Sequence, residues 1–361
     1  MTATEPYSVI ALSPRCFSSR TRAEFRRNIE HIGTFLPGAH AIATTQGVPP
    51  RLVVLPEMAI QGFRPRGARD GDLLCEIPGD ETQLLGAYAR DLDVFVAGQM
   101  SHVLDDDFPG RSFNVAFIVD PRGEVVYRRT KLQVEPFEVQ SRSTCVPHDV
   151  WDEWMAVKGD GNPLDALYPV ADTELGKLGM LICMEGNYPE TGRGLAMNGA
   201  EVIIRLTYHD PYVNNGWWEL QNRAHAHFNN AYVIAPNIGP QHFEEGGHSV
   251  DLCGGESMIV DYHGSVTIKR PYAASDTMIT EVIDLESLRR FRSRNGFGSW
   301  LKDLRTEQFE VIYGSPIYPK NQYLHEPLAA GDRLAHENGN LDRTIASLQD
   351  RGVLIPPRSS G

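Results

Sequence analysis

A carboxylate, an ammonium group and a thiol follow three predicted buried strands of this chain, at Glu57, Lys131 and Cys183. Strand ends hold side chains rigidly at the edge of a sheet, where α/β proteins often place their site residues. Cysteine is the best side-chain nucleophile near neutral pH, but only as the thiolate. A nearby carboxylate can take the thiol proton, and an ammonium group favours the anion. The three groups therefore have the chemistry of nucleophilic catalysis.

Each of these residues also has an ordinary structural explanation when it is taken alone. A carboxylate after a strand is often a cap or a surface group, and a lysine at a strand end is usually solvated. Cys183 follows Leu181 and Ile182, which is typical of a small buried apolar residue. Only the combination of all three distinguishes a site from these alternatives.

The combination resembles a known family. Leu-Pro-Glu57-Met, Arg-Thr-Lys131-Leu and Ile-Cys183-Met-Glu-Gly-Asn-Tyr-Pro-Glu190 resemble, in the same order, the three signatures of the nitrilase, or carbon–nitrogen hydrolase, superfamily. The segment after Cys183 is most similar to the aliphatic amidase and formamidase branch. The resemblance runs from about residue 7 to about residue 290.

The resemblance implies an amidase that converts a small amide to a carboxylic acid and ammonia through a Cys183 thioester. Glu57 would act as general base and then acid, and Lys131 would stabilise the oxyanion together with the backbone amide of Met184. Nitrile and N-carbamoyl hydrolysis use the same three residue types and remain alternatives. A non-catalytic binding protein on the same fold is the alternative of another class, although a protein without catalysis has no need of all three residues.

A second carboxylate holds the lysine in this family and touches the substrate. The family pattern places it seven residues after the lysine, which predicts Glu138 here, with Glu135 as the competing candidate.

The 52-residue gap between Lys131 and Cys183 is longer than the resemblance implies. The excess lies at about residues 140–170, which read as a loop-like insertion near the mouth of the site. Trp151 and Trp154 in this insertion, and Tyr208 after a later strand, are candidate substrate-binding residues together with Met184. The alternative is that the tryptophans fasten the insertion to the surface.

The elements that must position these residues alternate between helices and buried strands, with two hairpin signals at residues 120–123 and 262–264. This alternation predicts an α/β fold with mixed sheets. The resemblance implies a four-layer α-β-β-α sandwich. We expect one hydrolase domain over residues 1–314 and an extended C-terminal tail over residues 315–361.

Composition excludes several other classes of protein. The net charge of -13 argues against a nucleic-acid or membrane-surface partner. No apolar run is long enough to span a bilayer, and no secretory signal is recognised. The five cysteines are scattered without a C-x-x-C pair, which predicts neither disulfides nor a zinc site. We therefore expect a cytoplasmic protein without cofactor or metal, and the resemblance implies a homodimer or larger homo-oligomer.

Overall fold

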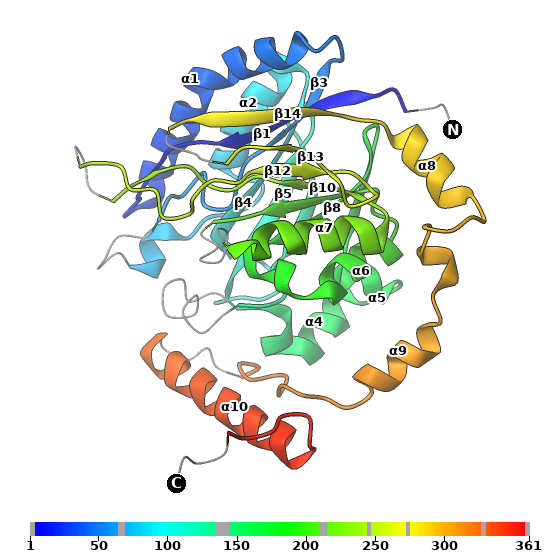
Figure 1. The fold of residues 1–361 in the computed structure, drawn as a ribbon. Coiled ribbons are helices and arrows are strands. Elements are labelled where there is room, and N and C mark those ends of the chain that lie inside the picture. The colour runs from blue at the N-terminus through cyan, green and yellow to red at the C-terminus, as the bar shows by residue number, and fades with distance from the viewer. Residues whose placement is uncertain are drawn as a thin grey trace.

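Within the ranges that the computed structural model describes, two six-stranded mixed sheets form the centre of the molecule (Figure 1). Those ranges are residues 4–63, 69–134, 145–208, 215–243, 247–271, 275–325 and 330–357. The first sheet has the order β14-β1-β3-β4-β5-β6, and the second has the order β13-β12-β10-β9-β8-β7.

The strands of the first sheet are β1 (Tyr7–Ser13), β3 (Pro50–Val54), β4 (Phe95–Leu104), β5 (Ser112–Val119), β6 (Val125–Thr130) and β14 (Thr277–Ile283). Those of the second are β7 (Val170–Thr173), β8 (Gly176–Ile182), β9 (Val202–Leu206), β10 (Tyr232–Ala235), β12 (Met258–Val260) and β13 (Val266–Lys269). A separate pair joins β2 (Cys16–Phe17) to β11 (Gln241–His242).

The helices of the main body are α1 (Phe25–Thr44), α2 (Asp80–Leu92), α4 (Trp151–Lys158), α5 (Pro163–Leu167), α6 (Pro189–Met197), α7 (Trp217–Asn229) and α8 (Leu285–Ser293). Towards the C-terminus follow α9 (Thr306–Tyr313) and α10 (Ala330–Asp350). Two of the 3-10 helices are η3 (Pro147–Val150), which contacts the C-terminal segment, and η4 (Cys183–Asn187), which begins at the candidate nucleophile. None of the described helices is both long and apolar enough to cross a membrane.

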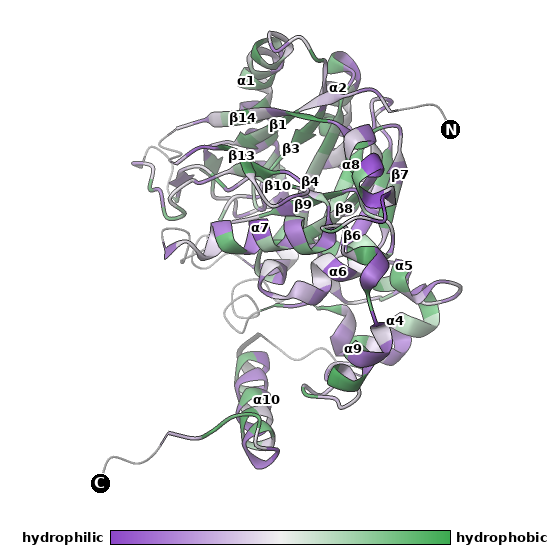
Figure 2. Cartoon of the chain, turned by 45° about the vertical axis from the view of Figure 1, so that its right-hand side comes forward, coloured by the Kyte–Doolittle hydropathy of each residue, from purple (hydrophilic) through white to green (hydrophobic). Residues whose placement is uncertain are grey.

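The strand residues alternate between two apolar layers, because successive side chains of a strand point to opposite faces. In β9, Val202 and Ile204 face the core between the two sheets, whereas Ile203 faces α6 and α7. In β1, Val9 lies in the same inner core, whereas Ile10 packs towards α1 and α2. Figure 2 shows the apolar residues concentrated in the strands and mixed polarity on the covering helices. The predicted four-layer α-β-β-α sandwich is confirmed.

The strand directions bring the predicted site residues to one end of the sandwich. β3 and β4 are parallel, β5 is antiparallel to β4, and β6 is antiparallel to β5, so β3 and β6 run the same way. Glu57 and Lys131 therefore follow the same edge of the first sheet. β8 and β9 are parallel neighbours in the second sheet, which places Cys183 beside Tyr208.

Both predicted hairpins are confirmed, at β5–β6 and at β12–β13. The prediction of a loop-like insertion at residues 140–170 was wrong, because η3, α4 and α5 lie there. Trp154 is the physical reason: its ring stacks on Phe108 at 4.9 Å and its indole nitrogen donates to the Ala166 carbonyl at 2.9 Å. Through Trp154 the insertion packs on the outer core, the apolar layer between the first sheet and helices α1 and α2.

The prediction of an extended tail over residues 315–361 was also wrong, since α10 occupies 21 residues of it. Tyr323, before α10, is buried, and the backbone amide of Tyr323 donates to the Asp149 carbonyl of η3 at 3.0 Å. The Arg333 guanidinium of α10 donates to the Asp149 carboxylate at 2.7 Å. The segment therefore docks on the insertion. Sequence periodicity underestimated α10 because its residues are mostly polar (Figure 2).

Candidate active site

Glu57, Lys131 and Cys183 lie close together in the protein interior, at the strand ends just described. Glu57 and Lys131 have side chains that are fully buried, and Cys183 is 6% exposed. Lys131 Nζ lies 3.5 Å from Glu57 Oε1. Burying such a pair is costly unless further hydrogen bonds satisfy the charges. The surroundings of Glu57 supply them.

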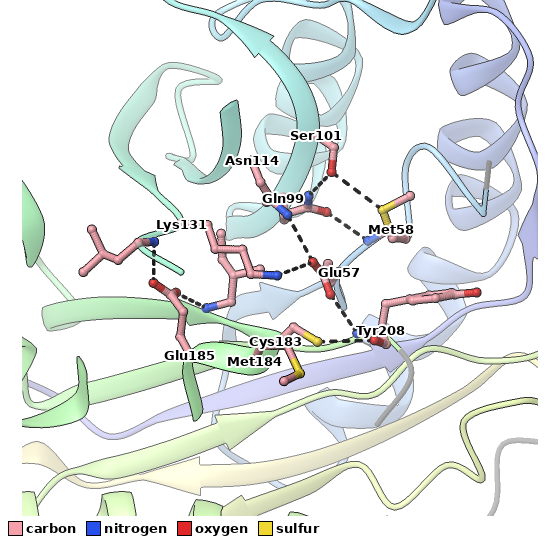
Figure 3. Close-up of polar contacts among 12 residues, drawn as sticks. Glu57, Met58, Gln99, Ser101, Asn114, Lys131, Cys183, Met184, Glu185 and Tyr208 are labelled. Atoms are coloured by element: carbon pink, nitrogen blue, oxygen red, sulfur yellow. Dashed lines mark hydrogen bonds and ion pairs between the residues drawn. The ribbon is translucent and has the colours of Figure 1, made fainter. Parts of the chain in front are cut away.

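Tyr208 connects Glu57 to Cys183 through its backbone. Its N–H donates to Glu57 Oε2 at 3.2 Å, and its carbonyl accepts from the Cys183 thiol at 3.4 Å (Figure 3). The carboxylate and the thiol are thus held by opposite polar groups of one residue.

Asn114 orients Glu57 from the first sheet. Its side-chain nitrogen donates to Glu57 Oε1 at 3.2 Å, and its backbone carbonyl accepts from the Lys131 amide at 2.8 Å. Gln99 fixes the amide of Asn114, because its nitrogen donates to Asn114 Oδ1 at 2.7 Å. The other end of Gln99 accepts from the amide of Met58, which adjoins Glu57, at 2.9 Å. The carboxylate is therefore fixed from two sides.

Glu185 joins the segment that carries Lys131 to the segment that carries Cys183. Its carboxylate accepts from Arg129 Nη1 at 2.6 Å and Nη2 at 2.8 Å, and both side chains are buried. The same carboxylate accepts from the backbone amides of Leu132 at 2.8 Å and Ile182 at 2.7 Å. These bonds fix the end of β6 against the end of β8.

Cys183 has a left-handed backbone conformation, with φ +49°. A residue other than glycine in this region costs roughly 1–3 kcal/mol and persists where the surroundings enforce it. Arg205 is one such contact, because its Nε and Nη2 donate to the Cys183 carbonyl at 3.3 and 3.2 Å. The turn places the thiol and the following amide of Met184 on the same short stretch of chain.

A family model described as carbon–nitrogen hydrolase matches residues 21–293, more than half of the chain. The protein belongs to the carbon–nitrogen hydrolase family. The predicted membership of the nitrilase superfamily is thereby confirmed.

This carbon–nitrogen hydrolase is similar in sequence to formamidases and similar in fold to solved structures of the nitrilase superfamily. Formamidases of Bacillus thuringiensis (strain Al Hakam) and Bacillus cereus (strain AH820) are 28% identical over 219 residues, which cover 60% of this chain and 57% of each relative. The fold is shared with the carbon–nitrogen hydrolase from Helicobacter pylori G27, at a TM-score of 0.62 and 20% identity over 86% of this chain and 99% of that one. It is also shared with the amidase of Nesterenkonia AN1, at a TM-score of 0.61 and 16% identity over 86% and 97% of the two chains.

Of the predicted substrate-binding residues of this carbon–nitrogen hydrolase, Met184 and Tyr208 lie beside Cys183, whereas Trp154 lies in the outer core. Met184 is half-buried next to Cys183, on the core between the sheets, and Tyr208 lies against Glu57 and Cys183 as described. Trp154 is buried in the outer core. This position corresponds to the alternative stated above, in which the tryptophan fastens the insertion to the body of the protein. Trp151 is half-buried, with its ring 6.0 Å from that of His148. The described contacts of Trp154 are with Phe108, Phe113 and Ala166, and that of Trp151 is with His148.

Glu138 and Glu135 lie outside the described residues, so the identity of the second carboxylate stays a prediction. Asn114, Glu185, Arg129 and Arg205 were missed by the sequence interpretation. Their signal was weak but present, since each is a polar residue beside or within a predicted buried strand.

No group of histidine, cysteine and acidic residues suited to a metal occurs in the part of the chain that the structure describes. His225, in α7, is buried, and its Nε2 lies 2.9 Å from the Gly186 carbonyl. Burial, and then the charge of Arg205, lower the pKa of His225 to about 4. The neutral ring therefore donates to the carbonyl at neutral pH.

Proposed function

We propose that the protein hydrolyses the carbon–nitrogen bond of a small non-peptide amide through a Cys183 acyl-thioester. The meeting of Glu57, Lys131 and Cys183 around the backbone of Tyr208 is the observation that supports this function most directly. The similarity to the formamidases, of which the matched segment covers 57%, supports hydrolysis of a carbon–nitrogen bond.

Acylation begins when Glu57 accepts the thiol proton and Cys183 Sγ attacks the amide carbon. The carbonyl π electrons move to oxygen, and the ammonium group of Lys131 and the backbone N–H of Met184 stabilise that oxyanion. When the oxyanion collapses, the carbon–nitrogen bond breaks and Glu57 gives the proton to the departing nitrogen. Ammonia leaves, and the acyl group remains on sulfur.

Deacylation repeats these steps with water as the nucleophile. Glu57 takes one proton from water, and the oxygen adds to the thioester carbon. The second oxyanion collapses with cleavage of the carbon–sulfur bond, and the thiolate regains the proton from Glu57. The products are a carboxylic acid and the original thiol.

The acyl group that the site prefers depends on the aromatic residues around Tyr208. The Tyr208 ring stacks on Phe63 at 5.6 Å, and Phe63 contacts Phe243 edge-on at 5.4 Å. Phe63 and Phe243 are both half-buried. We therefore propose these rings, in place of Trp151 and Trp154, as the aromatic surface nearest the site, and an apolar acyl group as the better substrate.

We propose Glu138 as the second carboxylate that holds Lys131 and touches the substrate, with Glu135 as the alternative. Glu138→Gln and Glu135→Gln, assayed side by side, decide between them. The variant of the true second carboxylate loses kcat by at least about tenfold, and the other stays close to wild type.

The function is tested by ammonia release from formamide, acetamide, benzamide, the matching nitriles and N-carbamoyl compounds. We expect release from the amides, and the ranking of nitriles and carbamoyl compounds decides between this function and its two chemical alternatives. Mass spectrometry after acid quenching should detect an acyl group on Cys183 during turnover.

Cys183→Ala should abolish turnover with the fold intact, because the nucleophile is lost. Cys145→Ala removes another buried thiol and should retain turnover. Activity of Cys183→Ala near that of wild type would contradict the mechanism. No ammonia from any compound, with Cys183 still reactive towards iodoacetamide, would favour the binding protein.

A further inference from the structure

Arg205 contacts the carbonyl of the residue that carries the thiol. Its guanidinium comes from the end of β9 and donates to the Cys183 carbonyl oxygen through both Nε at 3.3 Å and Nη2 at 3.2 Å. Arg205 is 1% exposed. Burying a guanidinium costs several kcal/mol of desolvation unless hydrogen bonds satisfy it, and two of the bonds that satisfy this one go to the Cys183 carbonyl.

Helix α7 holds the guanidinium in this position. Arg205 Nη1 donates to Asn222 Oδ1 at 3.1 Å, and Nη2 donates to Gln221 Oε1 at 2.7 Å. The guanidinium carbon lies 4.5 Å from the centre of the Trp218 ring, over its face. Three contacts from about one turn of α7 leave the cation little freedom and hold it against the Cys183 carbonyl.

Glycine at position 186 leaves room for this contact. A Cβ there would overlap the Arg205 guanidinium, so any larger residue would displace the cation or the turn. The Gly186 carbonyl is fixed in turn by the neutral His225 ring at 2.9 Å. The sequence Cys183-Met-Glu-Gly186 thus folds around the guanidinium.

The Cys183 carbonyl and the Met184 N–H belong to one peptide group. A hydrogen bond from a cation to the oxygen draws electron density through the amide, which makes the N–H at the other end a stronger donor. The same contact fixes the plane of that peptide, although Cys183 is in the unfavourable left-handed region. Both effects act on the amide that the proposed mechanism places at the oxyanion.

We propose that Arg205 is a positioning residue for the oxyanion, which it stabilises by orienting and polarising the peptide between Cys183 and Met184. This inference rests on the proposed function and adds to it a charge that acts through the backbone carbonyl of Cys183. An oxyanion exists only in the tetrahedral state. Loss of Arg205 should therefore lower kcat and weaken tetrahedral adducts, and should leave binding of the amide unchanged.

The test compares Arg205→Gln and Arg205→Lys with Arg292→Gln as the matched control. Arg292 also donates to backbone carbonyls, those of Asn230 at 2.8 Å and Ala200 at 2.7 Å, and among the described residues its hydrogen bonds do not reach Glu57, Lys131 or Cys183. Each variant is assayed for kcat and KM on the best amide. Each is also titrated with the aldehyde of the same acyl group, which forms a tetrahedral oxyanion on Cys183.

For Arg205→Gln we expect kcat to fall about tenfold to a hundredfold, somewhat less than for loss of an oxyanion donor itself, with KM nearly unchanged. Aldehyde affinity should fall by the same factor, and Arg205→Lys should recover part of both. Alkylation by iodoacetamide, which forms no oxyanion, should stay within about threefold of wild type, because the thiol is unaffected. Arg292→Gln should change stability only.

Parallel losses of kcat, aldehyde affinity and alkylation rate in Arg205→Gln would show a misplaced thiol and overturn the proposal. Unchanged kcat and aldehyde affinity would overturn it as well, while leaving the amidase function in place. If wild type neither releases ammonia nor binds the aldehyde in a Cys183-dependent way, the proposed function fails and this inference fails with it.

Discussion

At the scale of single residues, the carboxylate of Glu57 is held in place by several donors. It is fully buried and receives hydrogen bonds from Asn114 and from the backbone of Tyr208, with Lys131 at 3.5 Å. In the proposed mechanism Glu57 accepts and returns a proton twice per turnover, and such a base gains from fixed geometry because misplacement is costly. Neutral donors such as Asn114 achieve this without adding a further charge.

Asn114→Ala removes one of these donors. We expect kcat/KM to fall about tenfold to a hundredfold, because Glu57 loses its orientation. The free energy of unfolding should fall by about 1–3 kcal/mol, since Gln99 loses an acceptor. Steady-state assays and urea unfolding measure the two effects. Ser101→Ala is the control, because Ser101 also accepts from Gln99, at 3.0 Å, without touching Glu57; equal kinetic losses in both variants would contradict the role of Asn114.

His225→Gln tests the pH dependence that the buried ring imposes. The pKa of His225 is lowered from 6.5 to about 4, chiefly by burial and then by Arg205. Between pH 6.5 and pH 4 the unfolded chain therefore binds a proton at His225 that the folded protein does not bind. The free energy of unfolding of the wild type falls as the pH drops through this range. The gap corresponds to at most about 3 kcal/mol. Glutamine can still donate to Gly186 but does not titrate.

Urea unfolding of both proteins at several pH values between 4 and 7 measures this effect. The difference in free energy of unfolding should be constant above pH 6.5 and should shift in favour of the glutamine variant as the pH falls. A difference that is independent of pH across the window would exclude titration of His225 as the cause.

At the scale of elements, the site depends on how two strand ends from different sheets are joined. Glu185 accepts from Arg129 and Leu132 beside Lys131, and from Ile182 beside Cys183. Neither sheet alone defines the separation of the lysine and the thiol. The buried carboxylate therefore fixes the position of the turn after β8 relative to the end of β6.

Glu185→Gln should therefore cost about 3–5 kcal/mol of unfolding free energy, because a buried guanidinium loses its counter-charge. Turnover should fall as well, since Lys131 and Cys183 lose their common support. Thermal and urea unfolding measure the stability. The exposed pair Arg26–Glu30 supplies the control: Glu30→Gln should change stability by less than about 1 kcal/mol. Similar losses in both variants would refute a special role for the buried pair.

At the scale of the whole molecule, the C-terminal segment and the insertion between Lys131 and Cys183 stabilise each other. Arg333 of α10 pairs with Asp149 at 2.7 Å, and Arg111 Nη2 donates to the carbonyls of Tyr323 and Leu324 at 2.9 and 2.8 Å. α10 otherwise stands apart from the sandwich in Figure 1. Docking therefore depends on a few buried polar contacts and the Tyr323 side chain.

Arg333→Met should release this docking, because Asp149 would remain buried without its cation. We expect limited trypsin digestion to cleave after Arg343, the α10 site that wild type and variant share, at least about tenfold faster, which corresponds to a local loss of more than about 1.4 kcal/mol. Hydrogen exchange over residues 145–158 should rise in parallel. Lys320→Met is the control, since its partner Asp152 is 58% exposed, and it should change neither rate beyond about twofold. Unchanged cleavage in Arg333→Met would show that other contacts hold the segment.

The sequence by itself determined the two hairpins and the order of the candidate site residues. Glu57, Lys131 and Cys183 could be found because buried strands have continuous apolar runs and because the motifs that follow them are local. The hairpin between β5 and β6 followed from Asp120-Pro-Arg-Gly123 for the same reason. Such signals depend only on neighbours along the chain.

Tertiary structure alone decided which distant polar groups meet. Arg129 and Glu185 are 56 residues apart and Arg205 lies 22 residues beyond Cys183, and no periodicity relates such positions. Trp154 could fill a core or line a site equally well as a residue type, and the packing of the insertion on Phe108 decided for the core. The physical reason is common to these cases: burial satisfies a polar or aromatic side chain only through partners that folding brings together.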